Sequence, residues 1–314
     1  MIKIFFKKDG EILLTQSCQD LTSSGSILWI DLLDPSGDEK RAVEAFIGTE
    51  IQSRAQAEEI ESSSHYSESE QAIFCNTNFL SPSDDEMSMD PVSFILSKGV
   101  LVTLRDIPLR SFDLLQRKMQ ARPGLFSDCF AVFIAIVDKR VDLDADLVEL
   151  ISQDTTQFSK RINQKEDINE EFLLDINQLQ ENAMLVRENV VDKQRIISNV
   201  SKSDLCPEAY DHKFAIILQD TASLINHINF TFERLEYLQD TVVGIINLDQ
   251  NRIMKTFTFI SLLLMPTTLV ASFYGMNVSL PFSDRWWAWV AIIGVMALII
   301  VVLLFIFRHK KMLK

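Results

Sequence analysis

The sequence contains few cysteines and no pattern that would bind zinc or form a disulfide framework. Only four cysteines occur among 314 residues, and no two of them form a C-x-x-C pair. Such wide spacing argues against a zinc knuckle and against a small scaffold held by disulfides. We therefore expect Cys18, Cys75, Cys129 and Cys206 to be reduced, cytosolic and buried.

The chain also lacks the motifs of secreted proteins and of the common cofactor-dependent enzymes. Residues 1–10 have neither the long apolar core nor the small-residue cleavage site of a signal peptide, so we expect the first part of the chain in the cytoplasm. There is no Walker loop, no Gly-x-Gly-x-x-Gly and no nucleophile elbow, so no organic cofactor is expected. His65, His212 and His227 show no metal-ligand spacing, which leaves little support for a membrane-anchored enzyme or sensor.

Positive charge is scarce in the first four fifths of the chain. The net charge is −14, and the segment from Arg252 onward carries seven basic residues against one acid, which leaves −20 on residues 1–251. An acidic soluble part of this size repels nucleic acid and concentrates cations around it. Solubility alone accounts for the charge equally well. The excess of negative charge therefore excludes a nucleic-acid partner, but it does not identify a function.

Short apolar runs separated by polar turns occupy the first 120 residues. Lys98-Gly99 predicts a hairpin turn, and Pro35-Ser36-Gly37 precedes a predicted helix over 38–46. This part is therefore predicted to be a mixed helix-and-sheet domain. Six runs have the length and composition of strands: 2–6, 12–15, 27–31, 72–76, 92–96 and 100–104.

Helical periodicity replaces these runs after residue 109, where glycine and proline become rare. Apolar residues recur every three to four positions up to residue 203, and 199–207 is the expected break before the next helix. From about residue 208 to 274 the only proline is Pro266 and the only glycine is Gly244. One helix of roughly 100 Å is therefore predicted, at 1.5 Å per residue. A helix of this length is expected to be a stalk.

Two uncharged stretches near the C-terminus are long enough to cross a membrane. Residues 256–274 and 286–307 carry no charge, and each stretch can span the ~30 Å hydrocarbon layer. Tyr274 and Trp286 stand where aromatic rings favour the interface, and basic residues precede the first span and follow the second. We therefore place both ends of this hairpin in the cytoplasm and only 275–285 outside. Two buried core helices are the weaker alternative.

The first span carries more polar residues than a simple anchor requires. Polar groups in hydrocarbon need partners or water, so a stripe of them suits the lining of a pore. The alternative is a dry helix interface in which Ser and Thr bond back to their own helix. One helix cannot enclose a water path, so a pore requires several copies, with the second span facing lipid. The stripe, called the polar seam below, continues in steps of three and four through Asp240, Gly244, Asn247, Asn251, Met254, Thr258, Ser261, Met265, Thr268 and Ser272.

A short turn, 273–277, follows the polar seam at the expected outer end of the first span. Gly275 permits tight backbone geometry, and Asn277 offers a neutral carbonyl oxygen. Mg²⁺ gives up its water reluctantly, so amide oxygens that contact its hydration shell are chemically suitable. A Gly-x-Asn turn alone would nevertheless be ordinary.

The whole C-terminal string resembles the CorA family of magnesium channels. The resemblance rests on Asn251-Arg252-Ile253-Met254-Lys255, on 265–272 and above all on Tyr274-Gly275-Met276-Asn277, which is that family's signature. Upstream it extends through 29–32, 58–61 and 102–105. It implies an α+β cytoplasmic domain followed by a long helical stalk and two transmembrane helices, assembled as a homopentameric funnel. The domain boundaries expected on this basis are 1–122, 123–253, 254–274, 275–285, 286–307 and 308–314.

The resemblance also implies roles for particular residues. The outer selectivity ring falls on Gly275, Met276 and Asn277, with Tyr274 supporting the turn, and an acidic ring falls on Asp240. A polar ring of the inner pore falls on Asn251, one step after Asn247 of the polar seam, and a hydrophobic constriction falls on Met254 with Phe257 or Thr258, followed by Met265. A basic collar falls on Arg308, Lys310, Lys311 and Lys314. Candidates for regulatory Mg²⁺ between cytoplasmic domains are Asp84, Asp85, Glu86, Asp90 and Asp220.

The function implied is passive Mg²⁺ influx across a bacterial inner membrane, closed by cytoplasmic Mg²⁺, with Co²⁺ and Ni²⁺ as possible further ions. A zinc transporter of the same superfamily is the main alternative. The signature of that branch resembles Gly-Ile-Asn, whereas this chain has Gly275-Met276-Asn277 at the same place. Zinc also prefers His and Cys ligands, and the polar seam contains neither.

Overall fold

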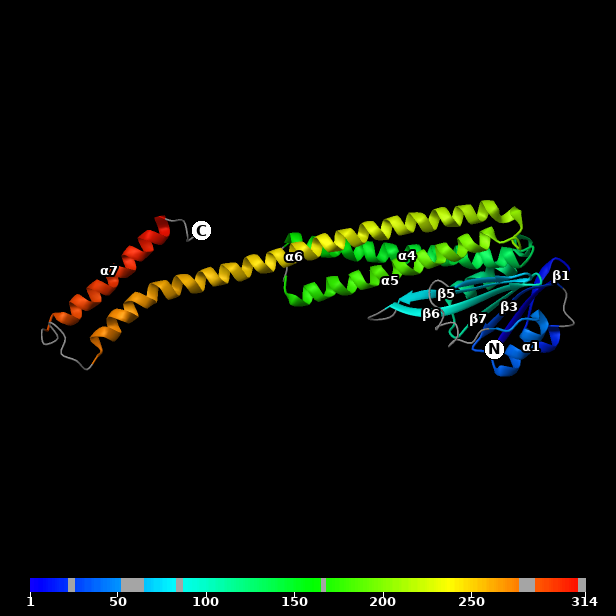
Figure 1. Cartoon of the computed structure of the whole chain (residues 1–314), viewed down its shortest axis with the longest axis horizontal. Helices are drawn as coiled ribbons and strands as arrows, with labels where there is room; N and C mark the ends of the chain where they lie inside the picture. The colour runs from blue at the N-terminus through cyan, green and yellow to red at the C-terminus, as the bar shows by residue number, and fades with distance from the viewer. Residues whose placement is uncertain (22–25, 52–64, 83–86, 165–167, 277–285, 310–314) are drawn as a thin grey trace. The chain divides into compact units, whose positions relative to one another are not determined.

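The computed structural model describes residues 1–21, 26–51, 65–82, 87–164, 168–276 and 286–309 (Figure 1). The chain divides into two compact units, Met1–Asp240 and Thr241–Lys314. The first unit contains a sheet with helices on both of its faces. The second contains two long apolar helices.

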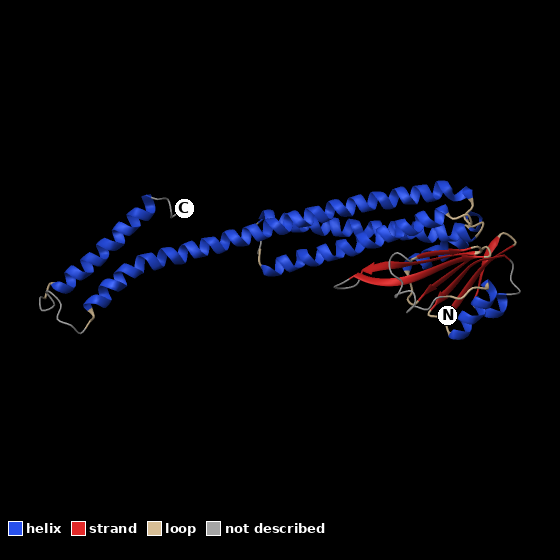
Figure 2. Ribbon diagram, viewed as in Figure 1, coloured by secondary structure: helices blue, strands red, loops and turns tan. Residues whose placement is uncertain are grey.

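One seven-stranded sheet forms the centre of the first unit (Figure 2). Its strand order is β2-β1-β3-β7-β6-β5-β4, and only the β3–β7 pair is parallel. The six predicted strands are confirmed, whereas β4 was missed because its four residues are polar and mostly exposed. The strands are β1 (Ile2–Lys8), β2 (Glu11–Thr15), β3 (Ser26–Leu33), β4 (Tyr66–Ser69), β5 (Ala72–Pro82), β6 (Met87–Ser97) and β7 (Val100–Arg105).

The hairpin between β6 and β7 turns at Lys98 and Gly99, as predicted. Both residues have positive φ, 49° and 76°, which is the backbone of a two-residue turn that matches the twist of the flanking strands. The turn fixes the register in which Ser97 faces Val100. The last six residues of β6 and five of the six residues of β7 are buried, so this register keeps both apolar runs in the core.

Helices cover both faces of the sheet, so its central strand is buried on both sides. In β3 six consecutive residues, 27–32, are buried, which explains why that run is almost continuously apolar. Ile4 and Ile30 pack with Val43 of α1 (Gly37–Ile47) on one face. The other face packs against α3 (Arg110–Ala121), α4 (Cys129–Gln164) and α5 (Glu170–Lys202). Figure 1 labels α4 and α5 beside the sheet.

A buried ion pair joins the two parallel strands at the middle of the sheet. Asp31 accepts hydrogen bonds from Arg105 Nε at 3.0 Å and Nη2 at 2.8 Å, and both side chains are almost fully buried. Thr103 donates to the same carboxylate at 2.9 Å and accepts from Trp29 Nε1 at 2.9 Å. The motif segments 29–32 and 102–105 therefore hold the sheet together.

The helix α6 (Asp211–Tyr274) confirms the predicted single long helix after residue 208. It has 64 residues and thus a length of roughly 96 Å at 1.5 Å per residue. The predicted break is also confirmed, because α5 ends at Lys202 and α6 begins after a short turn at 208–210. Pro266 lies inside the helix, and Figure 1 shows the ribbon bending in this last, orange part.

Two cysteines depart from the expectation of burial. All four thiols are free, but Cys18 and Cys206 are only half-buried. Cys75 and Cys129 are buried, and burial raises the pKa of the Cys129 thiol to about 12. The two inner thiols are therefore small apolar groups of the core and unreactive at neutral pH.

The second unit contains the end of α6 and α7 (Ala288–His309). These are the two helices of the described chain that are long and apolar enough to cross a membrane. Helix α7 begins two residues later than the predicted span, so Trp286 and Trp287 precede it. The ring of Phe259 contacts that of Phe307 edge-on, with 5.1 Å between the ring centroids.

Candidate functional site

Every residue of the polar seam is exposed along α6. Met254 is 63% exposed and Met265 is 66% exposed, although both belong to an apolar span. The half-buried or buried residues of this span are Phe259, Leu263, Pro266, Thr267 and Val270. They recur at steps of three and four, so they form a separate face of the helix.

The polar seam lies opposite the face of α6 that contacts α7. At about 100° per residue, Ser261 is rotated by about 200° from Phe259, and the same offset separates Met265 from Leu263. Phe259 is the residue that contacts Phe307 of α7. The second span therefore leaves the polar seam uncovered within one chain.

Phe257 lies at the edge of the polar seam. It is 64% exposed, and at 100° per residue it stands about 60° from the centre of the stripe. Phe257 and Met254, one helical turn apart, thus present large apolar side chains on neighbouring parts of one face. This arrangement is compatible with a constriction at that level.

Three of the six serine and threonine hydroxyls of the span bond back to their own helix. Thr258 Oγ1 donates to the carbonyl oxygen of Met254 at 2.8 Å, and Thr267 donates to Leu264 at 2.8 Å. This is the alternative that the sequence left open. It does not remove the polar character, because a hydroxyl that donates its proton to a carbonyl keeps its oxygen lone pairs for water.

The turn after α6 is described as far as Met276. Gly275 N–H donates to the carbonyls of Ala271 at 3.0 Å and Ser272 at 3.2 Å, which ends the helix. A Cβ on Gly275 would lie 3.3 Å from the Ala271 oxygen, so glycine is favoured here by a close approach. The Phe273 and Tyr274 rings meet edge-on. Asn277 lies outside the described residues.

Of the basic collar, Arg308 is described, and it is exposed in the last turn of α7. Positive charge there is favourable because the C-terminal end of a helix is partially negative. Lys310, Lys311 and Lys314 lie outside the described residues.

Two of the five candidate regulatory acids are described, and they lie on different elements. Asp90 lies on β6, where Ser88 donates to it at 3.2 Å, and Asp220 is exposed on α6. Asp84, Asp85 and Glu86 lie outside the described residues. In the described ranges no three His, Cys, Asp or Glu side chains gather as a metal site. A regulatory site between two chains stays a prediction.

An acidic group that the sequence did not single out lies near Asp220. Burial, and then the charge of Asp142, raise the pKa of Asp138 on α4, and Asp220 adds to this shift. Carboxylates that lie close enough to raise the pKa of Asp138 also attract cations to this group. Its sequence signal was the pair Asp138 and Asp142, one helical turn apart.

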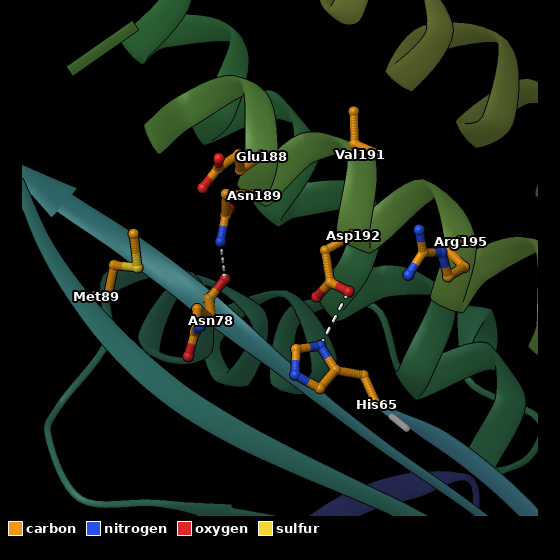
Figure 3. A pocket seen from close by; sticks show the side chains of 8 residues that line it. All are labelled: His65, Asn78, Met89, Glu188, Asn189, Val191, Asp192 and Arg195. Atoms are coloured by element: carbon orange, nitrogen blue, oxygen red, sulfur yellow. Dashed lines mark hydrogen bonds and ion pairs between the residues drawn. The ribbon is translucent and has the colours of Figure 1, made fainter. Parts of the chain in front are cut away.

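A cavity of about 410 Å³ lies between α5 and the β5–β6 hairpin (Figure 3). His65 Nδ1 pairs with Asp192 at 2.9 Å, and Asn189 Nδ2 donates to the carbonyl of Asn78 at 2.7 Å. These bonds tie α5 to the sheet and to the chain before β4. His65 is therefore accounted for as a structural residue, as its spacing predicted.

A buried charge cluster lies beside this cavity. Arg140 Nε donates to Asp144 at 2.8 Å, Lys193 Nζ pairs with Asp144 at 2.8 Å, and Lys193 also donates to Asn189. Burial lowers the pKa of Lys193 to about 8, although the charge of Asp144 opposes the shift. The sequence analysis missed this cluster. The sequence feature that could have indicated it is the presence of charged residues inside the apolar stripes of two helices.

Solved structures define the class to which this fold belongs. The complete structure of the CorA magnesium transporter from Methanocaldococcus jannaschii matches with a TM-score of 0.79 at 15% identity, over 98% of this chain and 97% of that one. The full-length CmaX protein matches with a TM-score of 0.74 at 15% identity, over 99% and 97%. The ZntB cytoplasmic domain from Vibrio parahaemolyticus matches at 0.57 and 14% identity, over 79% and 98%. The fold is thus that of proteins with a soluble α/β unit, a long helix and two apolar helices.

Sequence comparison gives the family. Residues 24–310 match the CorA-like Mg²⁺ transporter protein family. A magnesium transport protein CorA from Wolinella succinogenes is 31% identical over the full length of both chains, and one from Campylobacter jejuni is 32% identical over 91% of each. The chain belongs to the CorA-like Mg²⁺ transporter family. It is accordingly a membrane protein of a transporter family and not of an enzyme family.

Proposed function

We propose that this chain is one subunit of a channel that carries Mg²⁺ passively into the bacterial cytoplasm. The observation that supports this most directly is the polar seam, which is exposed on the face of α6 opposite α7. A face of amides, hydroxyls and thioethers is a poor surface towards lipid. Copies of α6 arranged around an axis would turn that face towards water.

Self-association follows from the same geometry. A single seam cannot enclose water, so each chain needs copies of itself, and we propose a homopentamer by analogy with the family. The exposed apolar residues of α7, such as Leu298 and Phe305, would then contact the bilayer. Both termini are assigned to the cytoplasm of an inner membrane, with Arg308 and the lysines after it at the membrane surface.

The path of the ion is assigned from the outer end inwards. Gly275, Met276 and Asn277 would admit Mg²⁺ with its inner waters in place, because amide oxygens suit an ion that dehydrates reluctantly. Thr268, Ser261 and Thr258 would line the path, and Met254 with Phe257 would close it. Asn251, Asn247 and Asp240 would receive the ion at the inner end. Two charges that cross a potential of ~100 mV gain about 4.6 kcal/mol, which is enough to drive uptake without ATP.

Regulation is assigned to acids of the soluble unit. Mg²⁺ held between carboxylates of neighbouring chains would neutralise their repulsion and keep the assembly closed. Asp90 and Asp220, with Asp84, Asp85 and Glu86, remain the candidate ligands. The expected domain boundaries, with the pore helix at 254–274, belong to the same proposal.

The test is Mg²⁺ influx into proteoliposomes at an imposed negative-inside potential. Wild type is compared with Asn277→Ala and with Ser279→Ala, a matched truncation two residues along the same segment. We expect Mg²⁺ influx in wild type and Ser279→Ala and its loss in Asn277→Ala.

Zn²⁺ is measured in parallel as the alternative cargo. Influx of Zn²⁺ but not Mg²⁺ would establish the zinc transporter in place of the magnesium channel. Influx of neither ion, with correctly inserted oligomers and low internal Mg²⁺, would contradict transport by this chain.

A further inference from the structure

A small cavity lies in the soluble unit at the N-terminal end of α3. Its volume is about 160 Å³, and it lies between the end of β5, the first turn of α3 and the middle of α4. Its polar lining residues are Ser81, Arg110, Ser111, Arg140 and Asp146, and the rest of the wall is leucine. Four of the five polar residues carry hydrogen-bond donors, and two of these four are arginines.

The helix end itself favours negative charge. Leu109 occupies the N-cap of α3 and supplies no side-chain cap, while Phe112 N–H bonds to the Leu109 carbonyl at 3.1 Å. Arg110 and Ser111 are the first two residues of this 12-residue helix. Asp113 N–H also bonds to the Leu109 carbonyl, at 3.4 Å, which leaves the N–H groups of Arg110 and Ser111 without a partner within the helix, and their partial positive charge suits an anion.

Ser111 provides an independent observation. Its side chain is 1% exposed, and its hydroxyl has no hydrogen-bond partner in the part of the chain that the structure describes. A buried hydroxyl without a partner costs stability unless a ligand or water satisfies it. Ser111 lines the cavity, so a ligand or water bound there would supply the partner that its hydroxyl lacks.

The two arginines come from two helices, and only Arg110 adds charge, because Asp144 neutralises Arg140. Arg110 is exposed at the rim, and no ion pair or hydrogen bond involves it across the described ranges. Arg140 is 4% exposed and donates to Asp144 through Nε and Nη2. Asp146, which is exposed, is the one carboxylate in the lining and opposes an anion.

We propose that this cavity binds a small oxyanion, namely phosphate, either free or as the phosphoryl group of a nucleotide. The N–H groups of Arg110 and Ser111 and the Ser111 hydroxyl would donate to its oxygens. Arg110 would close over it as a charged, forked donor, which is the geometry that arginine offers to phosphate. No residue of the polar seam takes part, so the site is separate from the transport path.

The test is calorimetric titration of the full chain in nanodiscs with inorganic phosphate, at fixed ionic strength and without added Mg²⁺. We expect Arg110→Gln to raise the Kd about tenfold, because a charge-assisted bond is lost. Arg117→Gln is the matched control, since Arg117 is exposed two turns along the same helix, and it should leave the Kd unchanged. Asp146→Asn should lower the Kd about threefold, because it removes a repelling charge.

Ser111→Ala separates binding from structure. If the hydroxyl serves a ligand, this variant binds phosphate more weakly by about fivefold while its thermal stability stays equal or rises, because a buried unpaired group is gone. A loss of stability with unchanged phosphate affinity would overturn the proposal, as would the absence of phosphate and nucleotide binding in wild type. Titration with ATP and AMP identifies the source, because a nucleotide that binds more tightly than phosphate makes the phosphoryl group the ligand. Phosphate that binds at least as tightly makes the free ion the ligand.

Discussion

The soluble unit and the membrane-spanning unit place their polar side chains in opposite ways. In the soluble unit Asp31, Arg105, Asp144 and Lys193 are buried, and each has a charged partner within 3 Å. In the membrane-spanning unit the polar seam is exposed throughout. Buried polar groups with partners within the chain hold the fold. Exposed polar groups on an apolar span indicate contacts beyond the chain, with water, ions or further copies.

The largest effect is expected where the soluble unit buries charge. Asp31→Ala should lower its free energy of unfolding by about 3–5 kcal/mol, because Arg105 would remain buried and unpaired. Hydrogen exchange of β3 and β7 in the full chain measures this. Arg41→Ala is the control, since that arginine is 76% exposed in its pair with Asp38, and it should change stability by about 0.5 kcal/mol at most. Equal effects of the two variants would contradict a structural role for the buried pair.

The stability of the soluble unit should depend on pH through the buried Lys193. Its pKa is lowered to about 8 in the folded chain from 10.5, so the unfolded chain binds more protons between these values and stability rises with pH there. Lys193→Met removes this contribution. The difference in unfolding free energy between wild type and Lys193→Met should shift in favour of wild type by about 2–3 kcal/mol between pH 7.5 and 10.5. Urea titrations of both proteins at the two pH values test it, and a constant difference would mean that Lys193 keeps its proton.

Substitutions in the polar seam should change Mg²⁺ influx and hardly change the stability of the protein. Thr258→Leu replaces an exposed hydroxyl with an apolar group and should slow Mg²⁺ influx by about tenfold, the equivalent of one lost contact to a charged species of ~1.4 kcal/mol. Ile260→Leu is the control, because Ile260 is exposed on the same helix but about 160° from Thr258. A seam variant with normal flux and lowered thermal stability would instead favour a dry helix interface.

The smallest effect is expected at the end of α6. Gly275→Ala places a Cβ 3.3 Å from the Ala271 carbonyl, so the turn must shift by a few tenths of an ångström. We expect about 0.5–1 kcal/mol of local strain, visible as a two- to fivefold loss of Mg²⁺ influx. Gly294→Ala is the control, because nothing lies within 4 Å of a Cβ there. Equal influx in the two variants would show that the close approach at Gly275 is not required.

Local pattern predicted most of the fold. The strands, the Lys98-Gly99 turn, the break before residue 211 and the long helix each follow from runs, turn residues or the absence of proline and glycine. Strand β4 could not be predicted, because its residues are polar and its place is set by pairing with β5. The parallel pairing of β3 with β7 joins residues about 70 positions apart, and nothing local indicates it.

The polar seam was visible in the sequence because a helix repeats at a fixed period. The sequence did not show that α7 contacts the opposite face of α6, since this depends on the contact between Phe259 and Phe307. The buried cluster of Arg140, Asp144 and Lys193 was also missed, because positions inside apolar stripes indicate burial but not which charges meet. Only the packing of α4 against α5 shows that the three meet inside the protein.

The order of the units along the chain has a consequence for synthesis. All 240 residues of the soluble unit leave the ribosome before the first apolar span begins near residue 256. At about 5–20 residues per second, translation of that unit takes roughly 12–48 s, which is ample time for domain folding. The β3–β7 pair can close as soon as Arg105 has emerged. The sheet therefore has time to form before the ribosome delivers any segment that the membrane can accept.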